Sequence, residues 1–162
     1  MGTINLVRID DRLIHGQVMT KWSKGMGTNA IYVIDDVTAA DDFMKDIYIS
    51  TNSSANLKIE VYSVDEAVEE YKKNQFGDDK VILLFKTVAY AKKFIEAGIP
   101  VDALCVGGIA KKPKATFVIS TVGLTQEDAQ QLKELHDRGI EVYFQIVPDT
   151  PKVSFEDAMK KM

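Results

Sequence analysis

One histidine lies in a segment whose other residue types suit the handling of an anion. His15 is preceded by Arg8, Asp10 and Arg12 and followed by Gly16. An imidazole titrates at about pH 6.5, so it can accept and release a phosphoryl group or a proton at neutral pH. Arginine stays charged at any working pH, and its planar fork can hold two phosphoryl oxygens. These residue types predict group transfer at His15, with Arg12 as the main partner of the anion.

The elements around His15 favour the same chemistry. Apolar residues at 4–9 predict a buried parallel strand, and residues 10–15 then form a loop at its carboxyl end. Open α/β sheets bind ligands at that edge. Gly16 allows the backbone close to an incoming group, and a helix beginning near Gln17 directs free N–H groups at it.

Asp10 in the loop and Arg8 in the strand before it each keep two interpretations. Asp10, like Asp11 or a loop carbonyl, can hold the second imidazole nitrogen of His15, or it can serve only as a turn and capping residue. Arg8 faces either the crevice of the sheet, where it contacts phosphate, or solvent.

Length and composition restrict the class of protein. The chain has 162 residues, which suits one domain over 1–162, and its single cysteine excludes an internal disulfide. The net charge of −4 argues against general nucleic-acid binding. The first twenty residues carry charge and lack the apolar core of a signal peptide. No segment has the run of about 20 apolar residues that a membrane-spanning helix needs. We therefore expect a cytoplasmic protein.

Strand-like and helix-like stretches alternate along the chain. Beyond the first strand and a helix near 17–26, the strands expected are AIYVID, LKIEVY, VILLF, ALCV, a shorter TFVIS and GIEVYFQIV. Helices are expected at about 39–50, after Ser63 with its capping box to Glu66, at 89–96, after Thr125, and at the carboxyl terminus. This order predicts a single α/β domain with a mostly parallel open sheet and helices on both faces.

Further candidates follow the other strands of the predicted sheet. Gly107 and Gly108 either line the site and admit a phosphoryl group or a sugar, or form a tight turn. Lys86 follows VILLF at the same edge and can donate to phosphoryl oxygens. A basic cluster beyond the glycine pair docks an acidic partner, supports the phosphate through its electric field, or is a solvated loop: Lys111, Lys112 and Lys114.

Two other reactive residue types are expected to be structural. His136 falls late in a predicted helix, where a cation suits the helix dipole. Cys105 lies inside a predicted buried strand, where a thiol acts as a small inert hydrophobe.

The string RIDDRLIHGQV, the Gly107-Gly108 pair and LLF at 83–85 resemble the IIB subunits of the mannose/fructose/sorbose class of the bacterial sugar phosphotransferase system. The similarity covers nearly the whole chain. It implies a phosphocarrier that acts as a protein-phosphohistidine–sugar phosphotransferase without a cofactor or metal. A IIA protein donates a phosphoryl group from its own histidine, His15 accepts it, through Nδ1 by family analogy, and it passes to a sugar brought in by membrane IIC and IID subunits.

The resemblance also implies a setting. The chain works in the cytoplasm in peripheral association with its transporter, and related subunits include homodimers. Because the sequence begins nearly at its first strand, either the IIA donor is expected to be a separate chain or the sequence is a fragment of a longer protein. The loop does not identify the sugar.

The sequence also has features of two other classes of function. Acidic pairs at Asp10-Asp11 and Asp35-Asp36 can hold Mg²⁺ in a phosphoaspartate receiver-like signalling domain. The third strand, however, ends in Val61, Tyr62 and Ser63, where a receiver needs its acceptor aspartate. A nucleotide-binding module suits the sheet type, but the chain has neither GxGxxG after the first strand nor a Walker-type motif.

Overall fold

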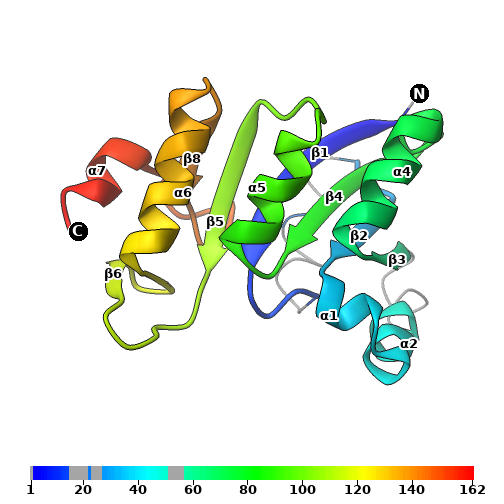
Figure 1. The fold of residues 1–162 in the computed structure, drawn as a ribbon, viewed down its shortest axis with the longest axis horizontal. Helices are drawn as coiled ribbons and strands as arrows, with labels where there is room; N and C mark the ends of the chain where they lie inside the picture. The colour runs from blue at the N-terminus through cyan, green and yellow to red at the C-terminus, as the bar shows by residue number, and fades with distance from the viewer. Residues whose placement is uncertain (1, 15–21, 23–26, 51–56) are drawn as a thin grey trace.

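A seven-stranded sheet forms the centre of the computed structural model, which describes residues 2–14, 22, 27–50 and 57–162 (Figure 1). The strand order is β3-β2-β4-β1-β5-β8-β9, and all neighbouring pairs are parallel except β8 and β9. The predicted α/β domain with a mostly parallel sheet is therefore confirmed. The strands are β1 (Thr3–Asp10), β2 (Ala30–Ile34), β3 (Lys58–Tyr62), β4 (Lys80–Phe85), β5 (Ala103–Gly108), β8 (Glu141–Phe144) and β9 (Val153–Ser154).

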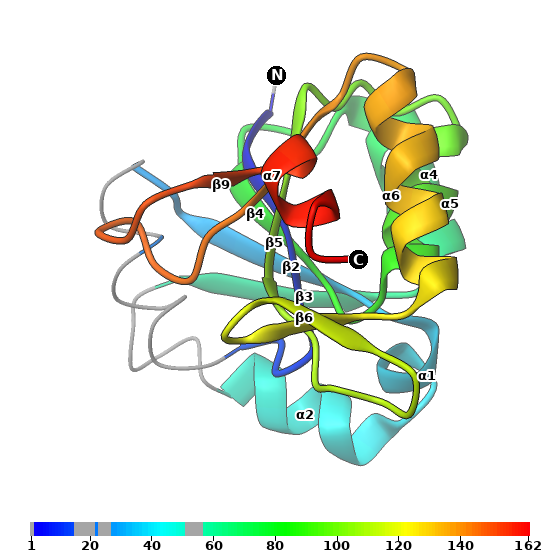
Figure 2. The same ribbon diagram turned by 90° about the vertical axis from the view of Figure 1, so that its left-hand side faces the viewer.

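The central strands are apolar throughout because both faces of the sheet are covered. Every residue of β2 and every residue of β4 after Lys80 is buried. One face carries α4 (Val64–Asn74), α5 (Val88–Glu96), α6 (Gln126–Asp137) and α7 (Phe155–Met159), as Figure 2 shows. The other face packs against Trp22 and against α2 (Asp42–Ser50), which contributes Tyr48 and Ile49. No helix in the described part of the chain is long and apolar enough to cross a membrane.

Local capping signals fix the helix starts. The Ser63 hydroxyl accepts from the Glu66 N–H while the Glu66 carboxylate accepts from the Ser63 N–H, which confirms the predicted capping box of α4. Thr125 and Asp128 form the same reciprocal pair at the start of α6. Thr87 caps α5.

Three predicted elements differ from the structure. The helix expected at 39–50 is two helices, α1 (Asp36–Ala39) and α2, because the Asp41 carboxylate accepts the N–H groups of Phe43 and Met44 and starts a new helix. TFVIS forms β6 (Thr116–Ile119), which pairs with β7 (Val122–Leu124) in a separate two-stranded sheet. The last long strand ends at Phe144, earlier than predicted. The helix expected near 17–26 lies outside the described residues, apart from Trp22.

The carboxyl ends of the parallel strands bring distant loops together at one edge of the sheet, the lower edge in Figure 1. These loops follow β1, β2, β4, β5 and β8, and comprise residues 11–14, 35, 86–87, 109–115 and 145–152. We call this edge the carboxyl edge.

Candidate active site

The site predicted around the first loop begins at the last residue of β1. Asp10 ends that strand, and the described loop runs from Asp11 to Ile14. His15, Gly16 and Gln17 lie outside the described residues, so their roles stay predictions. The structure describes the strand and loop that lead to His15, together with the residues that contact them.

Asp10 and Arg12 form a two-armed ion pair. Arg12 Nε donates to Asp10 Oδ1 at 3.0 Å and Arg12 Nη2 donates to Oδ2 at 2.9 Å, while the Arg12 backbone N–H reaches Oδ1 at 3.1 Å. The Asp10 side chain is fully buried, whereas that of Arg12 is 47% exposed. The hydrogen bond to Asp10 raises the pKa of Arg12, and the charges of Asp10 and Asp11 add to the shift. This pair holds a permanently charged fork at the surface, three residues before His15.

Arg8 lies beneath this pair. Its side chain has no exposed surface, and its guanidinium donates to the carbonyls of Gln145 and Ile146, each at 2.9 Å. Its Nη2 also donates to Asp10 Oδ2 at 3.2 Å. Neither predicted orientation of Arg8 is found, because its guanidinium faces protein carbonyls and a carboxylate instead of an open crevice or solvent. The geometry gives Arg8 contact with Asp10 in place of the predicted contact with phosphate.

Gly107 and Gly108 are strand residues of β5, so the tight-turn interpretation is wrong. A Cβ at Gly107 would overlap the Arg8 guanidinium, and one at Gly108 would lie 2.7 Å from Asp10 Oδ1. The glycine pair therefore makes room for the two buried charged side chains. Sequence reasoning missed this role, although two signals pointed to it. Arg8 and Asp10, two residues apart, lie on the same face of one strand, and two glycines end another strand.

Backbone and carboxylate contacts fix the course of the first loop. The Asp11 N–H donates to the Gly108 carbonyl at 2.9 Å, and the Asp11 carboxylate accepts from the Ala110 N–H at 2.7 Å. Leu13 is buried with a φ of 57°, a left-handed backbone that non-glycine residues rarely adopt. The loop is thus tied to the end of β5 before it reaches His15.

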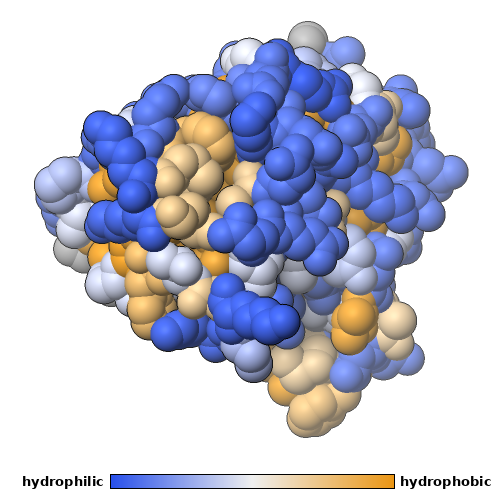
Figure 3. Space-filling view, turned by 60° about the vertical axis from the view of Figure 1, so that its left-hand side comes forward, coloured by the Kyte–Doolittle hydropathy of each residue, from blue (hydrophilic) through white to orange (hydrophobic). Residues whose placement is uncertain are grey.

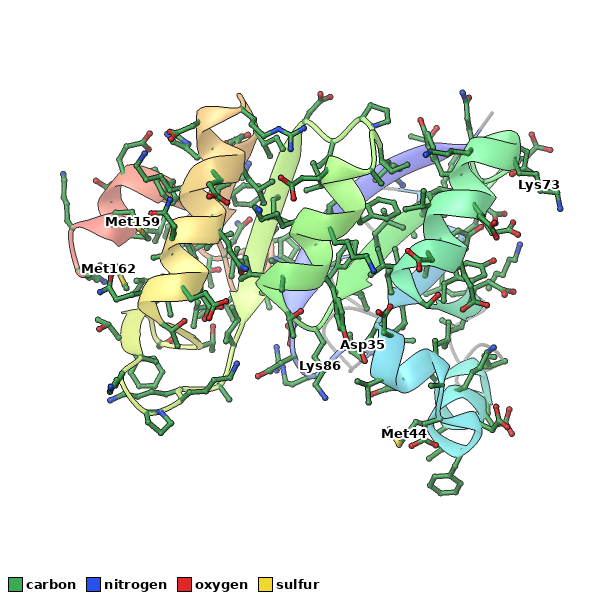
Figure 4. The ribbon with its side chains drawn as sticks, in the orientation of Figure 1. Asp35, Met44, Lys73, Lys86, Met159 and Met162 are labelled. Carbon is green, nitrogen blue, oxygen red and sulfur yellow. The ribbon has the colours of Figure 1, made fainter. Side chains whose placement is uncertain are left out.

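A hollow of about 510 Å³ opens at the carboxyl edge between the loops after β2, β4 and β5 and the start of α6. Lys86 and Lys112 line it together with acidic residues that include Asp35 and Asp128, and Figure 4 shows Lys86 and Asp35 at this edge. A smaller hollow next to it is lined by Asp11, Lys86 and Lys112. The structure therefore brings Lys86 to the first loop as predicted, in a surrounding of mixed charge.

The rest of the predicted basic cluster is exposed. Lys111 places its Nζ 5.5 Å from the centre of the Phe117 ring, a cation–π contact, and Lys114 lies in the exposed loop before β6.

His136 and Cys105 have structural surroundings, as predicted. His136 lies in the last turn of α6, stacks on the Phe155 ring and pairs with Glu156 at 3.1 Å. Cys105 is fully buried in β5, and burial raises the pKa of its thiol. A thiol kept protonated in this way is a poor phosphoryl acceptor.

The comparisons with known proteins identify the family. Residues 4–162 match the family model of the PTS system sorbose subfamily IIB component. The chain belongs to this family. It is 30% identical over 148 residues to the sorbose-specific EIIB component of Lacticaseibacillus casei, covering 91% of this chain and 90% of that protein. The IIB domain of the sorbose permease from Klebsiella pneumoniae has a similar structure, with a TM-score of 0.90, 30% identity, and coverage of 99% and 98%.

One group of relatives is longer. The chain is 32% identical over 159 residues to the mannose-specific EIIAB component of Escherichia coli K12, and these residues are 98% of this chain but 49% of that protein. The chain thus spans about half the length of those relatives. The predicted resemblance to IIB subunits of the mannose/fructose/sorbose class is confirmed, and the chain is a IIB component of a sugar phosphotransferase system.

The receiver-like alternative is not favoured. Asp10 is paired with two arginines, Asp35 caps α1, and the Asp36 carboxylate accepts from the Val64 N–H. Carboxylates occupied in this way do not form the open acidic cluster that a Mg²⁺ site needs. Family membership likewise argues against a nucleotide-binding module.

Proposed function

We propose that this IIB component carries a phosphoryl group on His15. A phosphohistidine of a IIA protein is the donor, and a sugar entering through membrane IIC and IID subunits is the acceptor. In the first transfer, the phosphorus–nitrogen bond of the donor breaks as one to an imidazole nitrogen of His15 forms. In the second, the bond to His15 breaks as the sugar hydroxyl oxygen bonds to phosphorus, and the hydroxyl proton passes to the imidazole. Neither transfer, as proposed, consumes water or requires a cofactor or metal.

The presentation of Arg12 is the observation that carries this proposal. A phosphoryl group adds almost two negative charges and three acceptor oxygens, so its carrier needs fixed cationic donors. Asp10 uses both carboxylate oxygens to hold Arg12 in one orientation, and about half of the Arg12 side chain still faces solvent. Phosphoryl transfer depends mainly on positioning and charge stabilisation, and Arg12 supplies both beside His15.

The other predicted site residues take supporting places in this proposal. Gly16 and the N–H groups near Gln17 keep the roles that the sequence predicts for them. Lys86 adds positive potential from the loop after β4. The described contacts of Asp10 give it the task of holding Arg12.

A transfer between two proteins needs a docking surface around the phosphoryl site. Val37 and Phe43 are 70% and 72% exposed, and Ile47 is 40% exposed, all on α1 and α2. Val37 also lines the hollow that contains Lys86. Figure 3 shows apolar side chains gathered at the lower end of the molecule, where these helices lie. An apolar area next to charged loops suits a transient complex with the IIA donor. The chain would then act in the cytoplasm, in peripheral association with the membrane subunits.

The test is phosphorylation of the chain by the general phosphotransferase proteins and a cognate IIA, followed by intact mass under mildly alkaline conditions. We expect one phosphoryl group on the native chain and none on His15→Ala. His136→Gln is the matched control, because it removes the chain's second histidine, which lies in a structural contact. Phosphorylation of folded His15→Ala, or no phosphorylation of the native chain by an active IIA, would overturn the proposal.

A further inference from the structure

We infer that Arg8 is a positioning residue for phosphoryl transfer, which acts through Asp10 on Arg12, and that Gly107 is a glycine because Arg8 occupies the space of its side chain. The inference rests on the proposed function. It concerns the buried layer under the site: Arg8, Asp10, Gly107 and Gly108.

Arg8 connects the site to the loop after β8, two strands away in the sheet. Its guanidinium donates to two successive carbonyls, those of Gln145 and Ile146, beyond the end of β8. These carbonyls bond a side chain of β1, two strands away, which gives a reason for the early end of β8. Gln145 is held in turn, because its Nε2 donates to the Thr150 carbonyl at 2.6 Å. The guanidinium is therefore fixed by the loop after β8 as well as by Asp10.

Asp10 transmits this position to the surface. Its Oδ2 accepts from Arg8 at 3.2 Å and from Arg12 at 2.9 Å, so one oxygen joins the buried and the exposed guanidinium. A displacement of Arg8 removes a cation that holds this oxygen in place. The fork of Arg12 then loses its fixed orientation, although Arg12 itself is unchanged.

A side chain at position 107 would have to displace the Arg8 guanidinium. A Cβ on Gly107 would overlap Cζ and both terminal nitrogens of the guanidinium. Gly107 is not among the glycines with positive φ, so its backbone conformation does not require glycine. Trp22 lies against Arg8, with its ring centre 4.8 Å from Cζ. The guanidinium thus lies between Gly107 of β5 and the Trp22 ring. A lysine at position 8 could not donate to the carbonyls of Gln145 and Ile146 with two separate nitrogens, as the guanidinium does.

A double-mutant cycle tests the inference. Single-turnover transfer from phosphorylated IIA is measured for the native chain, Arg8→Met, Arg12→Ala and the double variant. If Arg8 acts through Arg12, Arg8→Met slows the native chain by about 10- to 100-fold but slows Arg12→Ala by no more than about twofold. A general loss of folded protein would slow both backgrounds equally, and that result would overturn the inference. Lack of labelling of the native chain would instead overturn the proposed function.

Gly107→Ala provides a test that leaves every charged residue in place. We expect Gly107→Ala to slow transfer in the Arg8 chain and to have almost no effect in the Arg8→Met chain, where no guanidinium is displaced. If Gly107 instead admits the phosphoryl group, the loss is the same in both chains, and the inference fails. Should Arg8→Met not fold, Arg8→Lys replaces it. We then expect Arg8→Lys to slow transfer in the native chain and to have little further effect on the transfer rate of Arg12→Ala.

Discussion

Two carboxylates at opposite edges of the sheet are each held by a half-exposed cation, and their surroundings differ in burial. At the carboxyl edge, Asp10 is fully buried between Arg8 and Arg12. At the opposite edge, where the parallel strands begin and which we call the amino edge, Asp79 is 21% exposed. It accepts from Lys58 at 2.9 Å and from the Tyr32 hydroxyl.

The comparison shows what a buried carboxylate adds. Asp79 joins the start of β3 to the loop before β4, and its charge is shared with water. Asp10 is buried and accepts from the guanidinium groups of both Arg8 and Arg12, so it holds the Arg12 fork in one orientation. The Asp79 pair therefore joins two neighbouring segments, whereas under the proposed function the Asp10 pair fixes the charge of Arg12 for phosphoryl transfer.

The largest expected effect is on stability at the carboxyl edge. Asp10→Ala leaves the Arg8 charge buried without its carboxylate, and we expect a loss of about 3–5 kcal/mol in the free energy of unfolding. Asp79→Ala removes a partly exposed partner and should cost about 1 kcal/mol. Urea unfolding of both variants measures the difference. Equal losses would show that burial does not distinguish the two carboxylates.

The pH dependence of the amino-edge pair sharpens the contrast. Burial alone would raise the pKa of Asp79, but hydrogen bonds from Tyr32 and Lys58 outweigh it and lower the pKa from 3.8. A lowered pKa in the folded state stabilises the protein above the ordinary value, and this stabilisation is lost as pH falls through the folded value.

Asp79→Asn should therefore be less stable than the native chain at neutral pH, by about 1 kcal/mol. The gap should close as the pH falls below 3.8. Thermal or urea unfolding across this range measures it. A gap that stays constant with pH would mean that the charge of Asp79 is not the source of its contribution.

The smallest effect is expected from Lys86. Lys86→Ala should lower the rate of encounter with phosphorylated IIA by about two- to threefold at low salt, because it removes positive potential near the site. Added salt should erase the difference. Lys73→Ala, an exposed lysine on α4 at the other end of the molecule, is the control (Figure 4). An equal effect of both substitutions would assign it to net charge instead of position.

The sequence predicted the fold through local signals that need no tertiary knowledge. VILLF is apolar without alternation because both of its faces are buried, and the Ser63 and Thr125 caps act within four residues. The break between α1 and α2 was missed, since Asp41 suits either a helix interior or a cap.

The candidate site was predicted less completely, because its frame joins distant strands. Arg12 follows from its spacing to His15 alone. The buried place of Arg8 depends on carbonyls 137 and 138 residues away, and the role of Gly107 depends on Arg8. The segment around His15 places Arg8 and Asp10 on one face of a strand, but it does not reveal their partners in β5 and in the loop after β8.

The central claim is that Arg12, held by Asp10, stabilises the phosphoryl group beside it. The most direct test compares Arg12→Ala with Lys58→Ala in single-turnover transfer from phosphorylated IIA. Both substitutions remove a half-exposed cation from a carboxylate, at opposite edges of the sheet. We predict that Arg12→Ala loses about 2–4 kcal/mol of transition-state stabilisation, or about 30- to 1,000-fold in rate, and that Lys58→Ala transfers at the native rate. Equal rates for the two variants would contradict the account.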